Sequence, residues 1–399
     1  GQAIAALYGA IVGGGNATLP AETKAKIEAV ATALKSNRGR GLVVSGSNNL
    51  VEQQMVNAIN NAIGAYGSTI ATDRWSMQRK GSDKAIAKFA NDLTAGSVDA
   101  VIVLDGSNPC WDNPWAGQIA ESMSKAKVSI SMGGAPNETS LLCAYVAPNH
   151  HYLESWGDVE AIEGELSLMQ PTITPIFASV GRHGTRQEGQ SLLTWGQSAK
   201  LKADAEQPYM QFVSDTWAAT AFGAQSGFTS FRSFWDSSLQ DGVVTLPANA
   251  AVVYSGSVSG QAGTSGSGQE ISFFETVNIG NGVYASNPWL QEVPDPVTRT
   301  VWGNYLTVPV KWEGGNSYTA YQDLNHEEYK GKADIVTVTV NGLPLNVTAV
   351  RQFGQLPETF GLALGYGRTV TGVSGRAIGH DVGVNVYPWL PIKDGYVQY

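Results

Sequence analysis

The sequence has little charge, little cysteine and no long apolar run. Only 15% of its 399 residues are Asp, Glu, Lys or Arg, and the formal net charge is −9. Its basic residues are scattered, whereas nucleic-acid binding needs a basic face that neutralises phosphates. No apolar run reaches the ~18 residues that a membrane-spanning helix needs. The sequence therefore predicts no nucleic-acid partner and no direct membrane span, and its low charge predicts that other polypeptides cover much of the surface.

Cysteine is represented only by Cys110 and Cys143. Neither lies in a C-x-x-C or another cluster-binding spacing, so we expect no iron–sulfur or zinc ligands here. We interpret both as buried free thiols, with a disulfide between them as the alternative. Cys110 follows a proline in a turn, and we expect it to be the more exposed of the two.

Sequence motifs for catalysis are also missing. We find no Ser-His-Asp arrangement, no nucleophile elbow and no P-loop. The sequence therefore predicts no catalytic residue and no metal site. The chain opens GQAIAALYGAIVGGG, without an initiating Met or a charged region before the apolar stretch, so it does not resemble a signal peptide. We interpret it as a cut into a longer protein.

Helices and strands alternate through the first 150 residues. Helical periodicity and capping residues predict helices at 20–36, 47–64, 83–96 and 114–127. Short apolar runs predict strands at 41–46, 98–106, 127–134 and 141–149. Strands that alternate with helices are typical of a mostly parallel sheet covered on both faces.

The second half of the chain has a different pattern. Prolines and glycines predict an irregular segment at 151–200. A helix at 208–223 follows, and 231–244 is interpreted as a second helix that is ended by a turn at Gly242. A Gly/Ser-rich stretch at 255–268 separates two strand-like runs, 249–255 and 270–280. The last 70 residues are β-rich. They contain a hairpin at 334–353 that turns at Asn341-Gly342, and closely spaced glycines that indicate a small barrel.

The first candidate site is the turn Gly106-Ser107-Asn108-Pro109, directly after the strand VDAVIVLD. The carboxyl ends of parallel strands are where α/β proteins bind ligands. Gly allows close approach of the backbone, and Ser and Asn side chains can bond a phosphate or a ribose. One glycine falls short of a dinucleotide fingerprint, and Trp111 adds bulk nearby. A bound ligand and an empty, vestigial loop are both open, and we favour the empty loop.

The second candidate begins at Asn149 and His150, within NHHYLESWGD. Adjacent histidines point in different directions, so His150 and His151 rarely chelate one ion. We favour a hydrogen-bonded structural turn. His183, beside Arg182, suggests an anion cradle or a loop contact, and His380 is interpreted as a turn residue.

Three regions are long and compositionally unusual: 149–177 with 185–195, 278–308, and 361–388. They include HYLESWGD and NPWLQEVPDPVTRTVWGNY. From residue 45 onward the chain resembles the large periplasmic iron–sulfur (B) subunit of bacterial alternative complex III, a quinol-oxidising membrane complex. That subunit is similar to molybdopterin oxidoreductases but lacks the molybdenum cofactor.

The resemblance implies an α/β fold in three parts. These are a molybdopterin-oxidoreductase-like, mostly parallel α/β domain at 1–200, a connecting region of helices, Gly/Ser loop and extended segment at 201–330, and a small β-barrel of double-psi type at 331–399. In cofactor-bearing relatives a loop like Gly106-Ser107-Asn108 contacts a pterin nucleotide, and a segment like Asn149-His150 lines the pocket. Here both would be remnants of that pocket.

The resemblance also implies the partners. The [4Fe–4S] and [3Fe–4S] clusters would lie elsewhere in the subunit, with no cofactor in this segment. The partners would be a quinol-oxidising integral membrane subunit and c-type haem subunits, on the periplasmic side of the bacterial inner membrane. One alternative is a catalytic-subunit fragment of a true molybdopterin oxidoreductase of the polysulfide or dimethyl-sulfoxide reductase type. Another is a free-standing ligand-binding α/β protein.

Tryptophan is frequent, with eleven residues. Loops rarely keep large rings unless the rings pack against something. We therefore expect the tryptophans in proline-rich, loop-like surroundings to contact either partner subunits or the absent halves of this chain. These are Trp111, Trp115, Trp289, Trp302 and Trp389.

Overall fold

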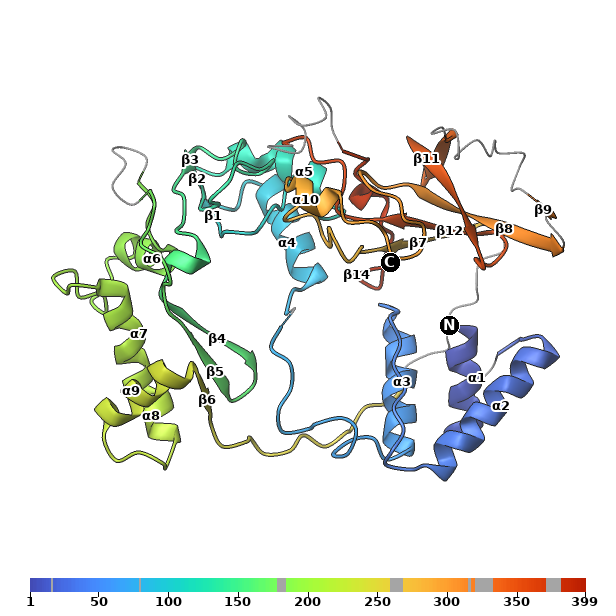
Figure 1. Cartoon of the computed structure of the whole chain (residues 1–399), viewed down its shortest axis with the longest axis horizontal. Coiled ribbons are helices and arrows are strands. Elements are labelled where there is room, and N and C mark those ends of the chain that lie inside the picture. The colour runs from blue at the N-terminus through green and yellow to red at the C-terminus, as the bar shows by residue number, and fades with distance from the viewer. Residues whose placement is uncertain are drawn as a thin grey trace.

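The computed structural model of the chain is a mixed α/β structure (Figure 1). It describes residues 1–15, 17–78, 80–177, 184–258, 268–314, 317–319, 333–370 and 382–399. Within these residues no helix is both long enough and apolar enough to cross a membrane.

Three helices form the N-terminal part: α1 (Gln2–Ile11), α2 (Ala21–Ser36) and α3 (Leu50–Ala62). The side chain of Asn49 caps α3 by accepting from the backbone N–H groups of Val51 and Glu52, as its position before an apolar period predicts. Ile59 and Ile63 of α3 are fully buried against α1 and α2. The helices predicted at 20–36 and 47–64 are confirmed.

Residues 41–46 form no strand, contrary to the sequence prediction. Their extended backbone pairs with a side chain instead of a second strand. Asn60 accepts from the N–H of Val43 at 2.9 Å and donates to its carbonyl at 2.8 Å. An amide side chain on α3 thus satisfies the backbone groups that a neighbouring strand would otherwise bond.

A parallel sheet follows, in the order β1 (Ala100–Val103), β2 (Val128–Ser131), β3 (Tyr145–Val146). The helices α4 (Asp83–Thr94) and α5 (Ala116–Ser122), with the short 3-10 helix η1 (Met123–Lys125), pack against one face. Val101 and Val103 are buried there with Leu93 and Ile119. The predicted parallel sheet is confirmed. The prediction that helices cover both of its faces is wrong for the described residues. Ile102, on the other face, is 44% exposed.

The segment 151–200 contains regular structure that the sequence analysis missed. After the 3-10 helix η2 (Tyr152–Glu154), β4 (Gly157–Ile162) pairs antiparallel with β5 (Glu165–Met169), and β5 pairs with β6 (Val243–Thr245). Gly164 has a φ of +78° at the hairpin turn. The prolines and glycines that suggested irregularity lie beyond this hairpin, so they do not interrupt it.

Four helices pack near this hairpin: α6 (Glu188–Trp195), α7 (Pro208–Ala219), α8 (Ala221–Ala224) and α9 (Phe231–Asp241). Trp217, Phe234 and Trp235 form an aromatic core with Leu168 of β5. Gly242, with a φ of +74°, ends α9 as predicted.

A six-stranded sheet occupies the C-terminal part, in the order β10-β11-β8-β12-β7, with β9 beside β8. Its strands are β7 (Glu270–Phe274), β8 (Leu306–Gly314), β9 (Ser317–Thr319), β10 (Ile335–Val340), β11 (Leu343–Phe353) and β12 (Thr359–Ala363). The short helix α10 (Pro288–Gln291), the 3-10 helix η5 (Tyr387–Trp389) and the pair β13 (Ile392–Lys393) and β14 (Tyr396–Val397) complete this part.

The predicted hairpin at 334–353 is confirmed, with Asn341 and Gly342 both at positive φ. The strand-like run 270–280 yields β7, whereas 249–255 pairs as no strand. The sheet takes strands from both sides of residue 331. The barrel and the domain bounds stay predictions.

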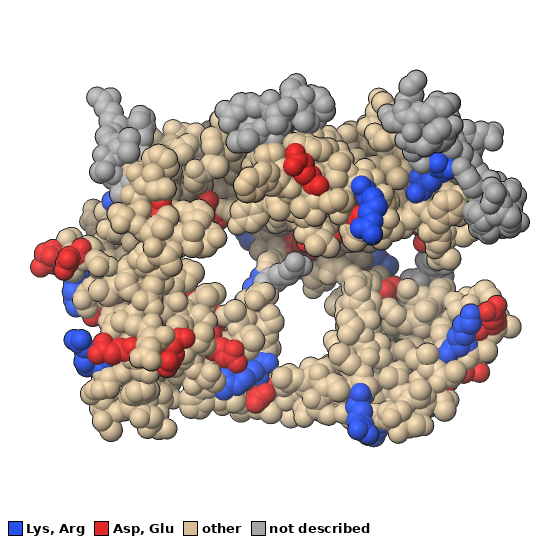
Figure 2. All heavy atoms as spheres, in the orientation of Figure 1, with Lys and Arg blue, Asp and Glu red and all other residues tan. Residues whose placement is uncertain are grey.

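The molecule exposes more surface than its mass requires. Its accessible area is 22670 Å², whereas a compact monomer of 42.2 kDa exposes about 15,000 Å². The space-filling view shows an opening through the molecule between the helices α1–α3 and the β4–β5 hairpin (Figure 2). The chain therefore presents a large area to other molecules or to solvent.

Candidate functional site

The predicted turn lies where the sequence placed it, at the carboxyl end of β1. Gly106 has a φ of +77°, a conformation that favours glycine. Asn108 is buried, and its side chain bonds only within the protein. It donates to Glu138 at 2.7 Å, and it accepts from the backbone N–H and the hydroxyl of Thr139 at 3.1 and 2.8 Å. The Asn108 amide, which the sequence offered as a ligand-binding group, therefore connects two loops of the protein through hydrogen bonds.

The backbone donors at this edge are bonded to carboxylates. Asp105 accepts from the N–H groups of Gly106 and Gly134, at 3.0 and 3.2 Å. The N–H of Asp105 itself donates to the carboxylate of Glu188 at 2.9 Å. A phosphate at this edge would have to replace these bonds and lie beside two acidic groups, which repel it. The edge is thus unsuited to an anion.

A buried ion pair joins this region to the six-stranded sheet. Arg368 donates to both carboxylate oxygens of Glu138, at 3.0 and 2.8 Å, and also to the carbonyl of Gly282 at 2.8 Å. Both charged side chains are 9% exposed. Burial by itself would raise the pKa of Glu138, but the backbone N–H of Val370, Arg368 and Asn108 outweigh it and lower the pKa.

Trp111 completes this junction. Its ring lies 5.0 Å from the Arg368 guanidinium, and its indole N–H donates to the carbonyl of Gly367 at 3.3 Å. It is buried in the core of the six-stranded sheet, in edge contact with Tyr387. Sequence reasoning missed the pair of Glu138 and Arg368, because 230 residues separate them and no motif connects them.

Both cysteines are free, half-buried thiols. Burial raises the pKa of Cys110 to about 11, an effect that a hydrogen bond with Thr139 only partly offsets. Burial also raises the pKa of Cys143. Neither thiol is activated as a nucleophile or a metal ligand, since both need the thiolate.

Asn149 and His150 lie at the end of β3, close to the turn after β1. Asn149 accepts from the backbone N–H of Glu188 at 2.7 Å, so it orients the residue that bonds Asp105. Nε2 of His150 lies 3.1 Å from the carbonyl of Thr185. Nδ1 of His150 and the hydroxyl of Thr185 are both buried without a hydrogen-bond partner. Among the described residues, these are two buried polar atoms beside this edge that lack a hydrogen-bond partner.

His151 and Glu154 form a local cap rather than a metal site. The carboxylate of Glu154 accepts from the N–H groups of His151 and Ile176, at 3.1 Å each. The bond from Ile176 is the main reason why the pKa of Glu154 is lowered. Among the residues that the structure describes, no group of three or more His, Cys, Asp or Glu side chains could hold a metal ion. His183 with Arg182, and His380, lie outside the described residues.

The five loop tryptophans have different environments. Trp111 and Trp389 are buried, at 4% and 1% exposure, and Trp115 packs against the same core. Trp302 packs beside a second small core. The expectation that the rings contact other polypeptide is wrong for Trp111 and Trp389, because the chain's own folding buries them. Trp115 and Trp302 are only half-buried, and for these two rings the expectation stays a prediction. Trp289 on α10 is 79% exposed and keeps that role open.

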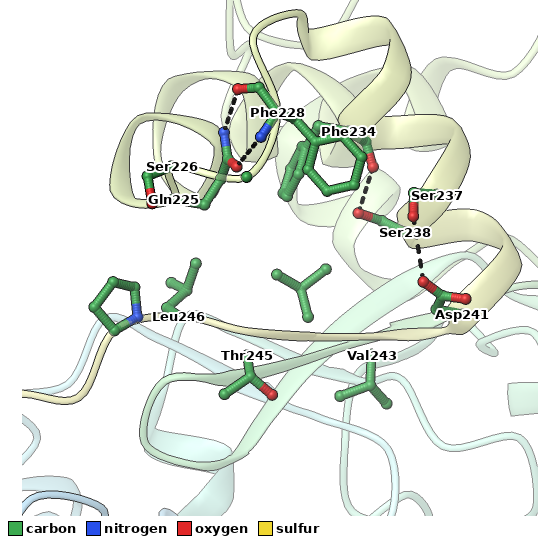
Figure 3. A pocket seen from close by; sticks show the side chains of 13 residues that line it. Gln225, Ser226, Phe228, Phe234, Ser237, Ser238, Asp241, Val243, Thr245 and Leu246 are labelled. Atoms are coloured by element: carbon green, nitrogen blue, oxygen red, sulfur yellow. Dashed lines mark hydrogen bonds between the residues drawn. The ribbon is translucent and has the colours of Figure 1, made fainter.

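A pocket of about 450 Å³ lies between α9 and β6, away from the candidate turn (Figure 3). Phe228, Phe234 and Leu246 provide its apolar wall. Its polar side chains bond each other and the backbone: Ser237 donates to Asp241, and Ser238 donates to the carbonyl of Phe234. The residues that line it include no histidine, cysteine, lysine or arginine.

No protein-family model matches the chain, and no curated protein matches it. Among solved structures, the chain is similar to acetylene hydratase from Pelobacter acetylenicus, with 10% sequence identity and a TM-score of 0.44. The aligned region covers 78% of this chain and 43% of that enzyme, so this chain corresponds to less than half of the enzyme's length.

Proposed function

We propose that the chain is a structural, cofactor-free part of the electron-transfer subunit of a quinol-oxidising membrane complex of the alternative complex III type. The proposal starts from the resemblance of residues 149–195, 278–308 and 361–388 to that subunit. It includes a molybdopterin-oxidoreductase-like fold with a double-psi barrel, iron–sulfur clusters outside this segment, and a place on the periplasmic side of the inner membrane.

The observation that supports a non-catalytic role is the state of the turn after β1. A pterin nucleotide needs free backbone donors and short polar side chains at such a turn. Here Asn108 is bonded by Glu138 and Thr139, and the N–H groups of Gly106 and Gly134 are bonded by Asp105. The residues present do not fit the nucleotide.

The surface supports a role in an assembly. The chain exposes roughly 7,700 Å² more than a compact monomer of its mass, and a standard interface buries only about 800 Å² per partner. The segment that contains Trp289 has further exposed apolar side chains, among them Val277, Tyr284 and Val297. Their backbone is held by internal bonds such as those from Asn278 to the carbonyl of Leu290 and from Val297 and Thr298 to Asp295. A rigid loop with exposed aromatic and aliphatic side chains is typical of an interface.

The experiment is purification of the assembly from native membranes through a tag on this protein. We expect c-type haem and quinol-dependent electron transfer to co-purify, with molybdenum and oxidised-pterin fluorescence far below one equivalent per chain. Recovery of one molybdenum atom and one pterin per chain would overturn the proposal, and so would recovery of the protein without any haem-bearing partner.

A matched pair of variants tests the interface. Trp289→Ser removes an exposed ring, and we expect it to weaken assembly by roughly 30-fold, as loss of a hot-spot residue does. Lys24→Ala, on the exposed side of α2, is the control. Both variants should keep the thermal stability of the unmodified chain. Equal assembly of both would show that the loop carries no partner.

A second candidate function is a fragment of a true molybdopterin oxidoreductase. The unpartnered Nδ1 of His150 and the unpartnered hydroxyl of Thr185 favour it, because buried polar atoms usually have a partner and a ligand could supply one. The molybdenum and pterin measurements above decide between the two candidates.

A further inference from the structure

The helices α1–α3 and the helices α7–α9 belong to two bodies with separate apolar cores. The core that contains Ile59 and Ile63 takes its described residues from the first 70 positions of the chain. The core around Trp217 and Phe234 takes its described residues from positions 166–246. Apolar burial therefore stabilises each body by itself and does not fix the position of one body relative to the other.

Two connecting segments, residues 66–78 and residues 247–258, run between these bodies along the lower side of the opening (Figure 1). The first follows α3 in the chain, and the second follows β6. None of the residues in either segment is buried. The connecting segments are thus held in place by contacts that lie outside both apolar cores.

The connecting segments contact each other at two points. The N–H of Val252 donates to the carbonyl of Thr72 at 2.8 Å. The rings of Tyr66 and Tyr254 stack, with their centroids 5.5 Å apart. These two contacts join the segments to each other, so both segments respond when one of them moves.

Arg74 fastens the first connecting segment to the β4–β5 hairpin. Its guanidinium donates to the carbonyl of Glu163 at 3.3 Å and to the carbonyl of Leu246 at 2.6 Å. Gly164 leaves room for it, because a Cβ at that position would lie 2.8 Å from the Arg74 guanidinium. The planar guanidinium carries several donors in a fixed arrangement, so it can bond two carbonyls at once. One side chain thus joins the connecting segment to the hairpin turn and to the residue after β6.

Backbone pairing beside Arg74 involves the outer edge of β4. The N–H of Met77 donates to the carbonyl of Ala161 at 2.9 Å. The N–H of Glu163 donates to the carbonyl of Trp75 at 3.0 Å. Asn249, in the second connecting segment, donates to the carboxylate of Glu163. A hydrogen bond outside an apolar core contributes only modest net free energy, and regions with few buried apolar contacts open at the lowest free energy.

We propose that the two connecting segments form a latch, locked by Arg74, which opens by local unfolding while both apolar cores stay folded. When the latch is open, α1–α3 turn as one body about the contact of Asn48 with the carbonyl of Val397, and the opening in Figure 2 changes its width. The latch is a conformational device of the fold itself, so it does not depend on the proposed role in an assembly.

Hydrogen exchange at single residues tests the latch in the unmodified chain. The amides of Met77 and Val252 should have protection factors at least roughly a hundredfold lower than those of Ile59 and Val213. The latter two lie within α3 and α7 and belong to the two cores. Equal protection at all four positions would overturn the proposal, because the connecting segments would then open only when the cores unfold.

A variant tests the lock. In Arg74→Ala the protection of the Met77 and Val252 amides should fall by a further factor of roughly ten, and the two helical amides should keep theirs. Arg232→Ala removes an exposed arginine of α9 and is the control, which should change none of the four. Unchanged protection at Met77 would overturn the role of Arg74. An equal loss at all four positions would also overturn it, because Arg74 would then stabilise the whole fold.

Spin labels measure the movement of the helices. The labels are attached through unnatural amino acids at Lys24 of α2 and at Gln240 of α9, both of which are exposed. The distribution of distances between the labels should broaden in Arg74→Ala and should be the same in Arg232→Ala and the unmodified chain. An unchanged distribution in Arg74→Ala would contradict the turning of α1–α3.

Discussion

The three-stranded sheet β1–β3 and the six-stranded sheet of the C-terminal part differ in how completely their apolar side chains are buried. The six-stranded sheet has a core closed by Trp111, Tyr387 and Trp389, with side chains from residues far apart in the chain. The three-stranded sheet covers one face with α4 and α5 and leaves Ile102 and Tyr145 exposed on the other. The first core is completed within the described chain, whereas the second sheet keeps an apolar face exposed among the residues that the structure describes.

The junction between the two sheets explains why the turn after β1 is closed. Asn108 bonds Glu138, Glu138 bonds Arg368, and Arg368 lies over Trp111. Polar groups at the end of a parallel strand are usually available for a ligand. Here they hold the two sheets together, so the turn after β1 acts as a structural connection.

The largest expected change in stability is at Trp111, whose ring lies at the junction between the two sheets. Trp111→Ala would remove a buried indole from the core of the six-stranded sheet and leave a cavity. We expect the free energy of unfolding to fall by about 3–5 kcal/mol, measured by urea denaturation of the purified protein. Trp289→Ala is the control and should change it by less than about 0.5 kcal/mol. Equal losses would contradict the distinction between a closed core and an exposed ring.

The next effect is at the buried ion pair. Glu138→Ala leaves Arg368 buried without its partner, and we expect a loss of about 3–5 kcal/mol. The pKa of Glu138 is lowered in the folded state, so its contribution is full above about pH 4.3 and is lost as pH falls through the lowered value. Urea titrations between neutral and acid pH should therefore bring the stabilities of the wild type and Glu138→Gln closer together as pH falls. A constant gap would contradict this role.

Two alanine variants within β1 compare how much each face of the three-stranded sheet contributes to stability. Val103→Ala empties a buried position against α4 and α5, and we expect a loss of about 2 kcal/mol in the isolated chain. Ile102→Ala, on the open face, should change stability by less than about 0.5 kcal/mol there. If both variants lose the same free energy of unfolding in the isolated chain, the face that carries Ile102 is already covered.

The smallest effect is at the hairpin turn of the six-stranded sheet. Gly342 has a φ of +80° and open space where a Cβ would be, so Gly342→Ala adds backbone strain alone, about 1 kcal/mol. Gly117 lies within α5 with open space at its Cβ, and Gly117→Ala should stabilise by about 0.5–1 kcal/mol instead. Thermal denaturation of both variants should show shifts of opposite sign.

The sequence predicted those features that depend on neighbouring residues. Asn49 caps α3, Gly242 ends α9, and Asn341-Gly342 turns the β10–β11 hairpin, because capping and turn formation involve only a few consecutive positions. The alternation of apolar runs with amphipathic helices also predicted the parallel order of β1–β3. The turn at Gly106 was located for the same reason.

Other features were decided by contacts between distant residues. Residues 41–46 have the composition of a strand, yet their partner is the Asn60 side chain. Trp111 lies in a loop, yet Tyr387 and Arg368 bury it. Local sequence thus determined helix caps and tight turns, since those preferences act over a few residues. The tertiary structure alone decided which side chains are buried, that Asn108 bonds Glu138 instead of facing a ligand, and that one face of β1–β3 stays open, since burial depends on what the whole chain brings to each surface.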